Sequence, residues 1–333
     1  MLTYNGLGDL GESLRTLHAQ SRAPDEIVVV DNASTDGTAA YIRATFPNVH
    51  LLAETVNHGF AKGNNVAARV ATGDYLVFVN DDVRLDERWL ANLVRPLEHD
   101  RGLVACQSLV MLHDEPGLIN TSGTLVNFLG VGWCRDYRKP LPSQGVKETP
   151  SLSGAAFAIR RAAFDAIGGF DGDYFMYQCD VDLSWRLRLA NIGRLGLATD
   201  SLVFHKYQFT RHARKYFLLE RNRLVTLLKN YRAGTLVLIL PALVLTELGV
   251  CLLAASQGWL RPKLAGYADV IRQLPRIWRK RRVIQRSRRL RDREMEPWLV
   301  GTIAFDEIDY PIVRFGGAIL SAYWAVIRRL IVW

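Results

Sequence analysis

The sequence of 333 residues predicts an α/β fold, a doubly wound and mostly parallel sheet followed by a C-terminal helical appendage. The sheet is predicted because short β-branched apolar runs alternate with helix-periodic runs over the first hundred residues. The appendage is predicted by an apolar run at residues 235–256. Apolar residues make up 49% and charged residues 23% of the chain, which excludes a disordered or fibrous protein.

Each predicted element has a pattern of its own. Strands buried on both faces are expected where the runs are short, apolar and β-branched, at 26–30, 48–52, 74–79, 102–112 and 154–159. Helices are expected where apolar residues recur at helical spacing, at 9–20, 36–46, 61–72, 86–99, 161–167 and 182–190. Residues 113–152 are rich in Gly, Pro and polar residues and predict loops with irregular strands.

The first strand and the domain boundaries need separate comment. Only Met1 to Tyr4 are available for a first strand, so we expect a few native residues to precede it. We expect an α/β domain at 1–210, with a first half at 1–112 and a second half at 113–210. A basic amphipathic helix at 211–232 and a membrane-associated helical region at 233–333 are expected to follow.

Charge and apolar runs in the C-terminal region suggest a membrane. The net charge is +9, and ten basic residues with one acid lie between Arg276 and Arg293. Such a block beside apolar runs at 235–256 and 315–327 predicts contact with an anionic membrane surface rather than with nucleic acid. The run at 235–256 fits a span, a re-entrant hairpin or an interfacial helix, and the alternative is a buried helix of a soluble domain.

A glycine-rich turn near the N-terminus supports one functional hypothesis. Gly6 to Gly11 match G-x-G-x-x-G after the first strand, and Asp31 follows twenty residues later. This is the dinucleotide fingerprint of a NAD-dependent Rossmann oxidoreductase. The four cysteines are far apart in the sequence, which favours a reduced compartment over a disulfide framework.

Polar residues at the strand ends support a second hypothesis. The ends carry Tyr4, Asp31-Asn32, Asn57 and Asn80-Asp81-Asp82. Because ligands bind at the carboxyl ends of parallel strands, these side chains are expected in one cleft. Paired carboxylates after an apolar strand suit Mg²⁺ or Mn²⁺, and such a cation suits a diphosphate. The alternative for Asp81 and Asp82 is an exposed turn that caps a helix.

These residues resemble the family-2 glycosyltransferases with the GT-A fold, particularly the bacterial branch that includes rhamnosyltransferases. The resemblance covers about residues 2–230. The matching pieces, in order, are Thr3-Tyr4-Asn5, VVDNASTDGT (29–38), NHGFAKGNN (57–65), GDYLVFVNDDV (73–83), SGAAFAIRR (153–161), GGFDGDYFMYQCDVDLSWRLR (168–188), His205 and ERNRL (220–224).

The resemblance implies roles for individual residues. It implies nucleotide binding by Thr3, Tyr4, Asp31, Lys62 and Asp81. It implies a divalent cation, Mn²⁺ or Mg²⁺, held by Asp82 and His205. It also implies a general base at Asp180, although Cys179 stands where relatives carry Glu. Acceptor-binding or supporting roles are implied for Gly154, Asp182, Trp185 and Arg186.

The activity implied is inverting transfer from a nucleotide sugar, dTDP-rhamnose first and a UDP-sugar next. The implied acceptor is a lipid-linked or cell-surface glycan at the cytoplasmic face of a prokaryotic membrane. Three rivals remain beside the oxidoreductase. They are a nucleotidyltransferase of nucleotide-sugar synthesis, a processive polysaccharide synthase, and an inactive membrane adaptor.

Overall fold

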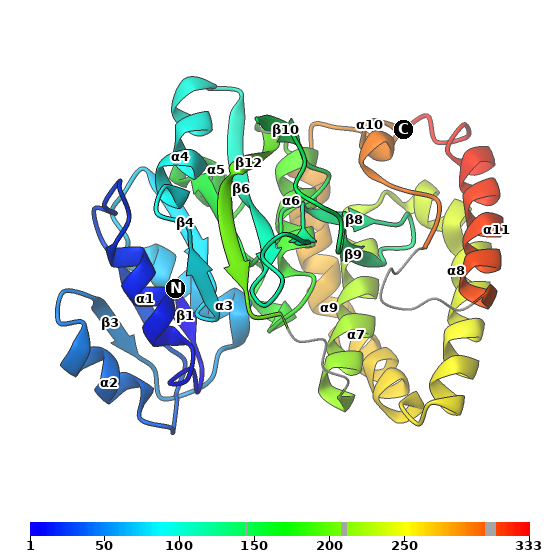
Figure 1. The fold of residues 1–333 in the computed structure, drawn as a ribbon. Helices are drawn as coiled ribbons and strands as arrows, with labels where there is room; N and C mark the ends of the chain where they lie inside the picture. Colours follow the sequence, from blue (N-terminus) through cyan, green and yellow to red (C-terminus); the bar gives the residue numbers. More distant parts are fainter. Residues whose placement is uncertain (144, 208–211, 304–310) are drawn as a thin grey trace. The chain divides into compact units, whose positions relative to one another are not determined.

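The computed structural model describes residues 1–143, 145–207, 212–303 and 311–333 of the chain (Figure 1). Two compact units divide it. The first comprises Met1–Thr124, Cys134–Ser184 and Ile192–Gln208. The second comprises Leu125–Trp133, Trp185–Asn191 and Phe209–Trp333.

The first unit opens with a parallel sheet of three strands, β1 (Leu2–Thr3), β2 (Val28–Asp31) and β3 (His50–Ala53), in that order. Helices α1 (Leu10–His18), α2 (Thr38–Thr45) and α3 (Gly59–Val70) follow these strands along the chain. The predicted alternation of strands and helices is therefore confirmed here. β2 is buried along its whole length, as its run of valines predicts.

A mixed sheet of seven strands completes the first unit. Its strands are β4 (Tyr75–Val79), β5 (Val83–Leu85), β6 (Leu103–Leu112), β7 (Ile119–Thr121), β10 (Val146–Glu148), β11 (Ala156–Arg160) and β12 (Arg194–His205). β6 and β12 pair in parallel, whereas β11 runs antiparallel to both β4 and β6. The parallel pairing expected from the alternation thus holds in part of the sheet, and the second half of the unit adds antiparallel strands.

The next elements are shorter, and some of them are divided between the two units. Helices α4 (Trp89–His99) and α5 (Arg161–Ala166) precede a 3-10 turn at Gly172–Tyr174 and helix α6 (Cys179–Leu189). The expected helix at 182–190 therefore begins three residues earlier than predicted, so that Asp180 lies in its first turn. Strands β8 (Thr124–Val126) and β9 (Gly132–Cys134) pair with each other.

Helices dominate the second unit. They are α7 (Ala213–Asn230), α8 (Ala233–Ser256), α9 (Leu260–Ser287), α10 (Asp292–Met295) and α11 (Pro311–Ile327), with a 3-10 turn at Glu296–Trp298. α7 packs along α9 (Figure 1). α8 is long and apolar enough to cross a membrane by length and composition, a criterion that core helices of soluble proteins also meet. α9 lies inside the helical region expected at 233–333, but its bounds were not predicted.

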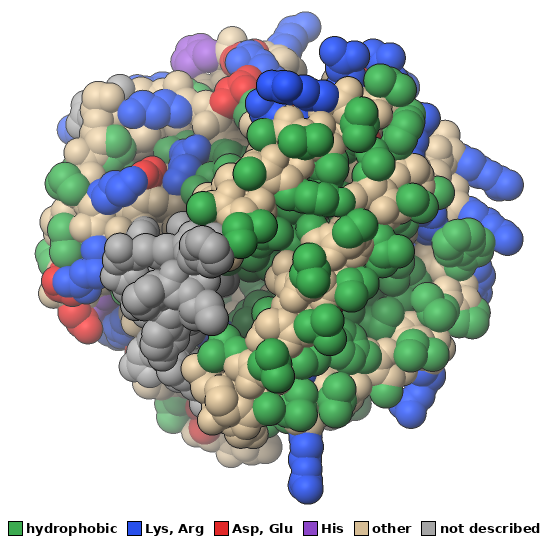
Figure 2. Space-filling view, turned by 90° about the vertical axis from the view of Figure 1, so that its right-hand side faces the viewer, with side chains coloured by type: hydrophobic (Ala, Val, Ile, Leu, Met, Phe, Trp, Pro, Cys, Tyr) green, Lys and Arg blue, Asp and Glu red, His purple; other side chains and the backbone are tan. Residues whose placement is uncertain are grey.

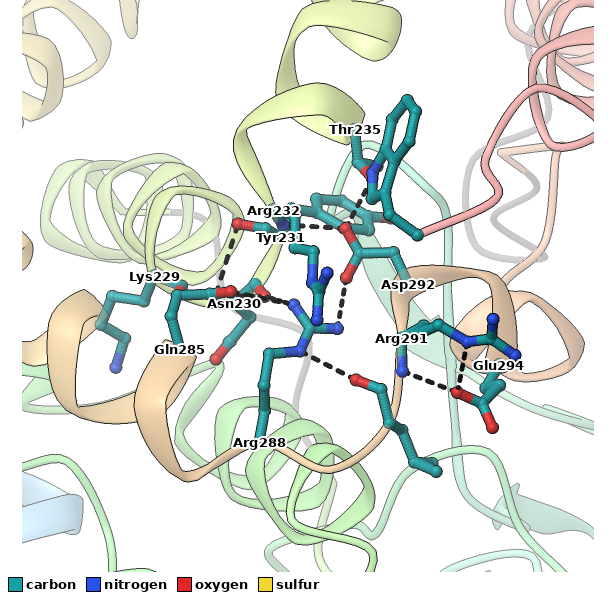
Figure 3. Close-up of polar contacts among 12 residues, drawn as sticks. Lys229, Asn230, Tyr231, Arg232, Thr235, Gln285, Arg288, Arg291, Asp292 and Glu294 are labelled. Atoms are coloured by element: carbon teal, nitrogen blue, oxygen red, sulfur yellow. Dashed lines mark hydrogen bonds and ion pairs between the residues drawn. The ribbon is translucent and has the colours of Figure 1, made fainter.

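Part of the predicted basic block faces the interior of the second unit. Arg281 Nη1 donates to the carbonyls of Leu228 and Tyr231 at the end of α7. Arg288 forms an ion pair of 2.5 Å with Asp292, and both side chains are 1% exposed (Figure 3). The prediction that the whole block faces an anionic partner is therefore wrong for these two arginines, which satisfy helix ends and a buried carboxylate.

Candidate active site

Asp81 lies against the glycine-rich turn. A Cβ on Gly6 would come within 2.6 Å of Asp81 Oδ2 and 2.2 Å of Thr3 Oγ1. The missing side chain therefore lets the turn approach both groups closely. Burial is the main cause that raises the pKa of Asp81 to about 6, and the Asp82 charge adds to it.

The loops after β1 and β2 are joined by hydrogen bonds at the predicted nucleotide site. The backbone N–H of Asn5 donates to Ser34 Oγ at 2.8 Å, and that of Thr35 donates to Asn5 Oδ1 at 2.8 Å. Asp31 is 3% exposed and accepts the N–H of Ser34 at 3.0 Å. Tyr4 is 52% exposed beside these loops, so its ring is available to a ligand.

Lys62 also belongs to the predicted nucleotide site. It lies on α3 with an exposed side chain. A Cβ built on Gly172 would lie 3.5 Å from the Cβ of Lys62. The 3-10 turn at Gly172–Tyr174 therefore lies close to the backbone end of this lysine side chain. No hydrogen bond to Asp31 or Tyr4 is seen for Lys62 among the described residues, and its role stays a prediction.

Asp82 and His205 meet at the predicted cation site. β12 pairs with β5 so that His205 lies opposite Val83, the residue after Asp82. His205 Nε2 is 3.2 Å from Asp82 Oδ1. His205 Nδ1 lies 3.1 Å from Asn120 Oδ1, a contact that orients the ring and leaves Nε2 toward Asp82. Burial opposes ionisation of Asp82, but His205 and neighbouring donors lower its pKa overall.

These two side chains fit a divalent cation. Asp82 Oδ1 is buried, and its contact with His205 Nε2 has the distance of an ion pair without the geometry of a hydrogen bond in the described part of the chain. A carboxylate oxygen and an imidazole nitrogen on facing loops are suitable donors for Mn²⁺ and acceptable ones for Mg²⁺. No group of three or more His, Cys, Asp or Glu side chains clusters around a common point in the described residues, so a cation here would complete its coordination with ligand oxygens or water.

Asp180 is held by backbone donors at the start of α6. Its Oδ2 accepts the N–H of Gly154 at 2.9 Å, and its Oδ1 accepts the N–H of Val181 at 2.9 Å. Burial is the main cause that raises the pKa of Asp180, and these two hydrogen bonds oppose it. Cys179 stands where relatives carry Glu, but it is 2% exposed and its thiol donates to the Tyr177 carbonyl. Burial also raises the pKa of this thiol, so it does not supply the negative charge that a glutamate would place beside Asp180.

A short contact path connects Asp180 to the acidic triplet. Gly154 binds Asp180, and the carbonyl of the next residue, Ala155, accepts the N–H of Asn80 at 2.9 Å. The path exists because β11 pairs with β4 in a register that sets Ala156 opposite Val79. The first unit therefore links acids from two distant parts of the sequence, Asp180 and the Asn80-Asp81-Asp82 triplet, through the backbone of Gly154 and Ala155.

The remaining predicted residues lie deeper. Asp182 is fully buried and accepts a hydrogen bond of 3.1 Å from the Tyr174 hydroxyl. Trp185 is 4% exposed and packs edge-on against Tyr231 in the second unit, with ring centres 5.0 Å apart. Arg186 is 8% exposed. These positions favour supporting roles over contact with a reacting group.

Two features near Asp180 were missed from sequence. Phe175, Tyr177 and Gln178 have φ between 61° and 65°, a region that costs a residue with a side chain about 1–3 kcal/mol. Nothing in their residue types predicts it. Gln107 accepts the N–H of Ser153 at 2.9 Å, and a buried glutamine inside an otherwise apolar strand was a usable signal.

Comparison with known proteins decides the family. Residues 1–168 match the family described as Glycosyl transferase family 2. The chain belongs to this family. It is therefore a glycosyltransferase, and the oxidoreductase hypothesis based on Gly6–Gly11 is wrong. Among these glycines, Gly6 makes room for Thr3 and Asp81.

Two relatives in bacteria are rhamnosyltransferases by name. The N-acetylglucosaminyl-diphospho-decaprenol L-rhamnosyltransferase of Mycobacterium tuberculosis is 30% identical over 237 residues, which is 63% of this chain and 76% of that protein. The O-antigen chain rhamnosyltransferase WbaN of Salmonella anatum is 23% identical over 221 residues, 65% of this chain and 68% of that protein.

Solved structures confirm the GT-A fold. GalNAc-T7 with UDP, GalNAc and Mn²⁺ aligns with a TM-score of 0.56 at 18% identity, over 70% of this chain and 47% of that one. The mannosyltransferase PcManGT of Pyrobaculum calidifontis with GDP-Man and Mn²⁺ aligns with a TM-score of 0.51 at 22% identity, over 86% and 84% of the two chains.

Proposed function

We propose that this glycosyltransferase moves a sugar, with inversion, from a nucleoside diphosphate sugar to a lipid-linked glycan at the cytoplasmic face of a bacterial membrane. The path from Asp180 through Gly154 and Ala155 to Asn80 is the observation that carries the proposal. It connects a carboxylate with raised pKa to Asn80, two residues before Asp82 of the Asp82 and His205 pair, and this supports a base beside a diphosphate site.

In this mechanism the chain binds the donor and removes one proton. Thr3, Tyr4, Asp31 and Lys62 surround the nucleoside, while Asp81 lies beside its ribose. Asp82 and His205 would hold Mn²⁺ or Mg²⁺, which when bound neutralises charge on the diphosphate.

Asp180 supports the chemical step. As the acceptor oxygen bonds to the anomeric carbon, the bond from that carbon to the diphosphate oxygen breaks, and Asp180 takes the proton of the acceptor hydroxyl. Gly154 and Val181 hold the carboxylate in one orientation for that transfer. The nucleoside diphosphate then leaves.

The names of the relatives support a choice of substrates. A decaprenyl-diphosphate acceptor and a rhamnosyl group in the mycobacterial relative favour a polyprenyl-diphosphate-linked acceptor here, with dTDP-rhamnose as the first donor to test and a UDP-sugar as the second. Attachment to an anionic membrane by the second unit would bring the enzyme to such an acceptor.

Replacement of Asp180 tests the proposal. Asp180→Asn keeps the shape and removes the base, so we expect turnover to fall by about 10²–10⁴. Binding of nucleotide with Mn²⁺, followed by calorimetry, should stay unchanged. Asp165→Asn on α5, outside the predicted site, serves as a matched control. Normal turnover in Asp180→Asn would remove the assignment of the base.

A further inference from the structure

Helix α8 carries an apolar stripe that nothing in the described part of the second unit covers. Its members recur at helical spacing and are 47–74% exposed: Val237, Leu240, Val244, Leu245, Leu248 and Leu252. α11 extends this surface with Ile319 and Val326, at 54% and 62% exposed. The Tyr323 hydroxyl donates to the Leu238 carbonyl at 2.7 Å and fixes α11 to α8. Together these eight side chains form the apolar face (Figure 2).

The side of α8 that contacts α7 and α9 is anchored by charge. Glu247 is the only charged residue of α8, and its carboxylate pairs with Arg223 of α7 and with Lys263 of α9, the latter at 2.8 Å. Lys263 also pairs with Glu220 at 2.5 Å. The Tyr267 hydroxyl donates to Glu247 as well. α8 therefore turns its acid toward α7 and α9 and its aliphatic side chains outward.

The N-terminus of α8 is anchored as well. Asp292 Oδ2 accepts the N–H of Arg232 at 2.8 Å and the hydroxyl of Thr235 at 2.5 Å (Figure 3). Trp333 Nε1 donates to the same Thr235 hydroxyl at 2.9 Å. Because Asp292 is itself paired with Arg288, the start of α8 is held by a buried network.

These anchors argue against a transmembrane orientation of α8. A 24-residue helix is about 36 Å long, enough to cross a bilayer. Spanning with the anchors intact would carry Arg223, Lys263 and the arginine-rich helix α9 into hydrocarbon, at a high desolvation cost. A helix that lies in the plane of the interface avoids that cost, because only its apolar face leaves water.

Helix α9 supplies the charge that complements an anionic lipid surface. Four exposed arginines recur along one side of it and form the basic stripe, Arg272, Arg279, Arg282 and Arg286. Beside them Ile271, Leu274 and Trp278 are 42–66% exposed. Lys and Arg side chains also lie around the edges of the apolar face (Figure 2). Aliphatic side chains beside arginines match acyl chains beside anionic headgroups.

We propose that the apolar face inserts into one leaflet of an anionic bilayer, with α8 and α11 in the plane of the interface and the basic stripe on the headgroups. This proposal rests on the proposed function, because it describes how the enzyme would reach an acceptor that lies in the membrane. A second copy of the chain is a poorer occupant, because pairing two such faces would bring two basic edges together. The face also lacks the aromatic and hydrogen-bonding residues typical of protein interfaces.

Vesicle sedimentation of the full chain tests this proposal. Leu245→Asp with Leu252→Asp should reduce binding to vesicles of equal phosphatidylcholine and phosphatidylglycerol by about tenfold or more, since both side chains would leave the acyl region. Leu141→Asp with Val146→Asp is the matched control, with the same added charge on exposed apolar side chains of the first unit. It should bind as the unmodified chain does.

Charge reversal tests the basic stripe. Arg279→Glu with Arg282→Glu should abolish the preference for phosphatidylglycerol over pure phosphatidylcholine vesicles, whereas Arg43→Glu with Arg69→Glu in the first unit should retain it. Alkaline carbonate should release the bound chain. Retention after carbonate would overturn the interfacial orientation in favour of a span. Equal vesicle binding by both aspartate variants would contradict the proposal that lipid covers the apolar face. Loss of a dimer in Leu245→Asp with Leu252→Asp would contradict it as well, because a second copy of the chain would then cover this face.

The proposed function is read out separately on the same samples. Stabilisation by a nucleoside diphosphate with Mn²⁺ should be the same in all four variants, because each of them leaves the predicted nucleotide site intact. Vesicle binding without any stabilisation by the nucleoside diphosphate would overturn the proposed function and support insertion of the apolar face. Stabilisation by the nucleoside diphosphate without vesicle binding would overturn only the proposed insertion of the apolar face.

Discussion

Gly6 shows how a single missing side chain shapes the candidate site. In Gly6→Ala the new Cβ would meet Thr3 Oγ1 and Asp81 Oδ2 at less than 3 Å, whereas nothing lies within 4 Å of a Cβ on Gly8. Displacing those groups should weaken binding of nucleoside diphosphate by about tenfold, an overpacking cost of about 1–3 kcal/mol being usual. Calorimetry on Gly6→Ala and on Gly8→Ala checks this, and equal affinities would contradict it.

The titration of Asp180 gives a second prediction at this scale. Burial raises the pKa of this carboxyl above its ordinary value of 3.8. Since a general base acts in its ionised form, kcat/KM should fall as pH drops through that raised pKa. A pH profile measured with saturating Mn²⁺ should show this acidic limb, and a rate that stays flat down to pH 3.8 would contradict the prediction.

At the scale of elements, the Glu247 network determines how α8 packs. Burial opposes ionisation, but Arg223 and Lys263 lower the pKa of Glu247 from 4.5 to about 2. Removing the charge leaves Arg223 and Lys263 to share the single carboxylate of Glu220, so Glu247→Gln should lower the free energy of unfolding by about 3 kcal/mol. Urea unfolding checks this, with exposed Glu87→Gln as the control expected to change little.

The same network sets a pH dependence of stability. Because the pKa of Glu247 is lower in the folded than in the unfolded chain, its contribution is complete above pH 4.5 and is lost as pH falls toward 2. Unfolding of the unmodified chain should therefore become easier over that window. The Glu247→Gln variant should lack this part of the dependence, and identical pH profiles for the two proteins would contradict the assignment.

At the scale of the whole molecule, ligand binding should stabilise the protein only when nucleotide and cation are both present. We expect the melting temperature to rise with dTDP or UDP plus Mn²⁺, since a ligand at about 100 times its Kd adds about 2.7 kcal/mol. Asp82→Ala should lose the part of the shift that depends on the cation. A shift of the same size without any cation, measured in chelator, would contradict the predicted role of Asp82.

The sequence alone was enough to predict the family and the first sheet, and it supplied the acids that we propose for the site. Alternating apolar runs and polar strand ends are local patterns, so the order of residues was enough to predict β2, β4 and the Asn80-Asp81-Asp82 triplet. The paired carboxylates Asp81-Asp82 likewise predicted a cation site, and the family resemblance implied a base at Asp180 and a second cation ligand at His205. Helix α8 was predicted from its length and composition.

Only the tertiary structure decided how these parts are used. The antiparallel register of β11 joins Asp180 to the triplet, and Cys179 turned out to be buried beside a carbonyl. Arginines that look alike in sequence differ in the structure: Arg281 donates to carbonyls at the end of α7, whereas the arginines of the basic stripe are exposed. The ion pairs of Glu247 determine which side of the apolar helix α8 packs against α7 and α9. The reason is physical: pairing register and the partners of a buried charge depend on residues distant in sequence, which no local pattern records.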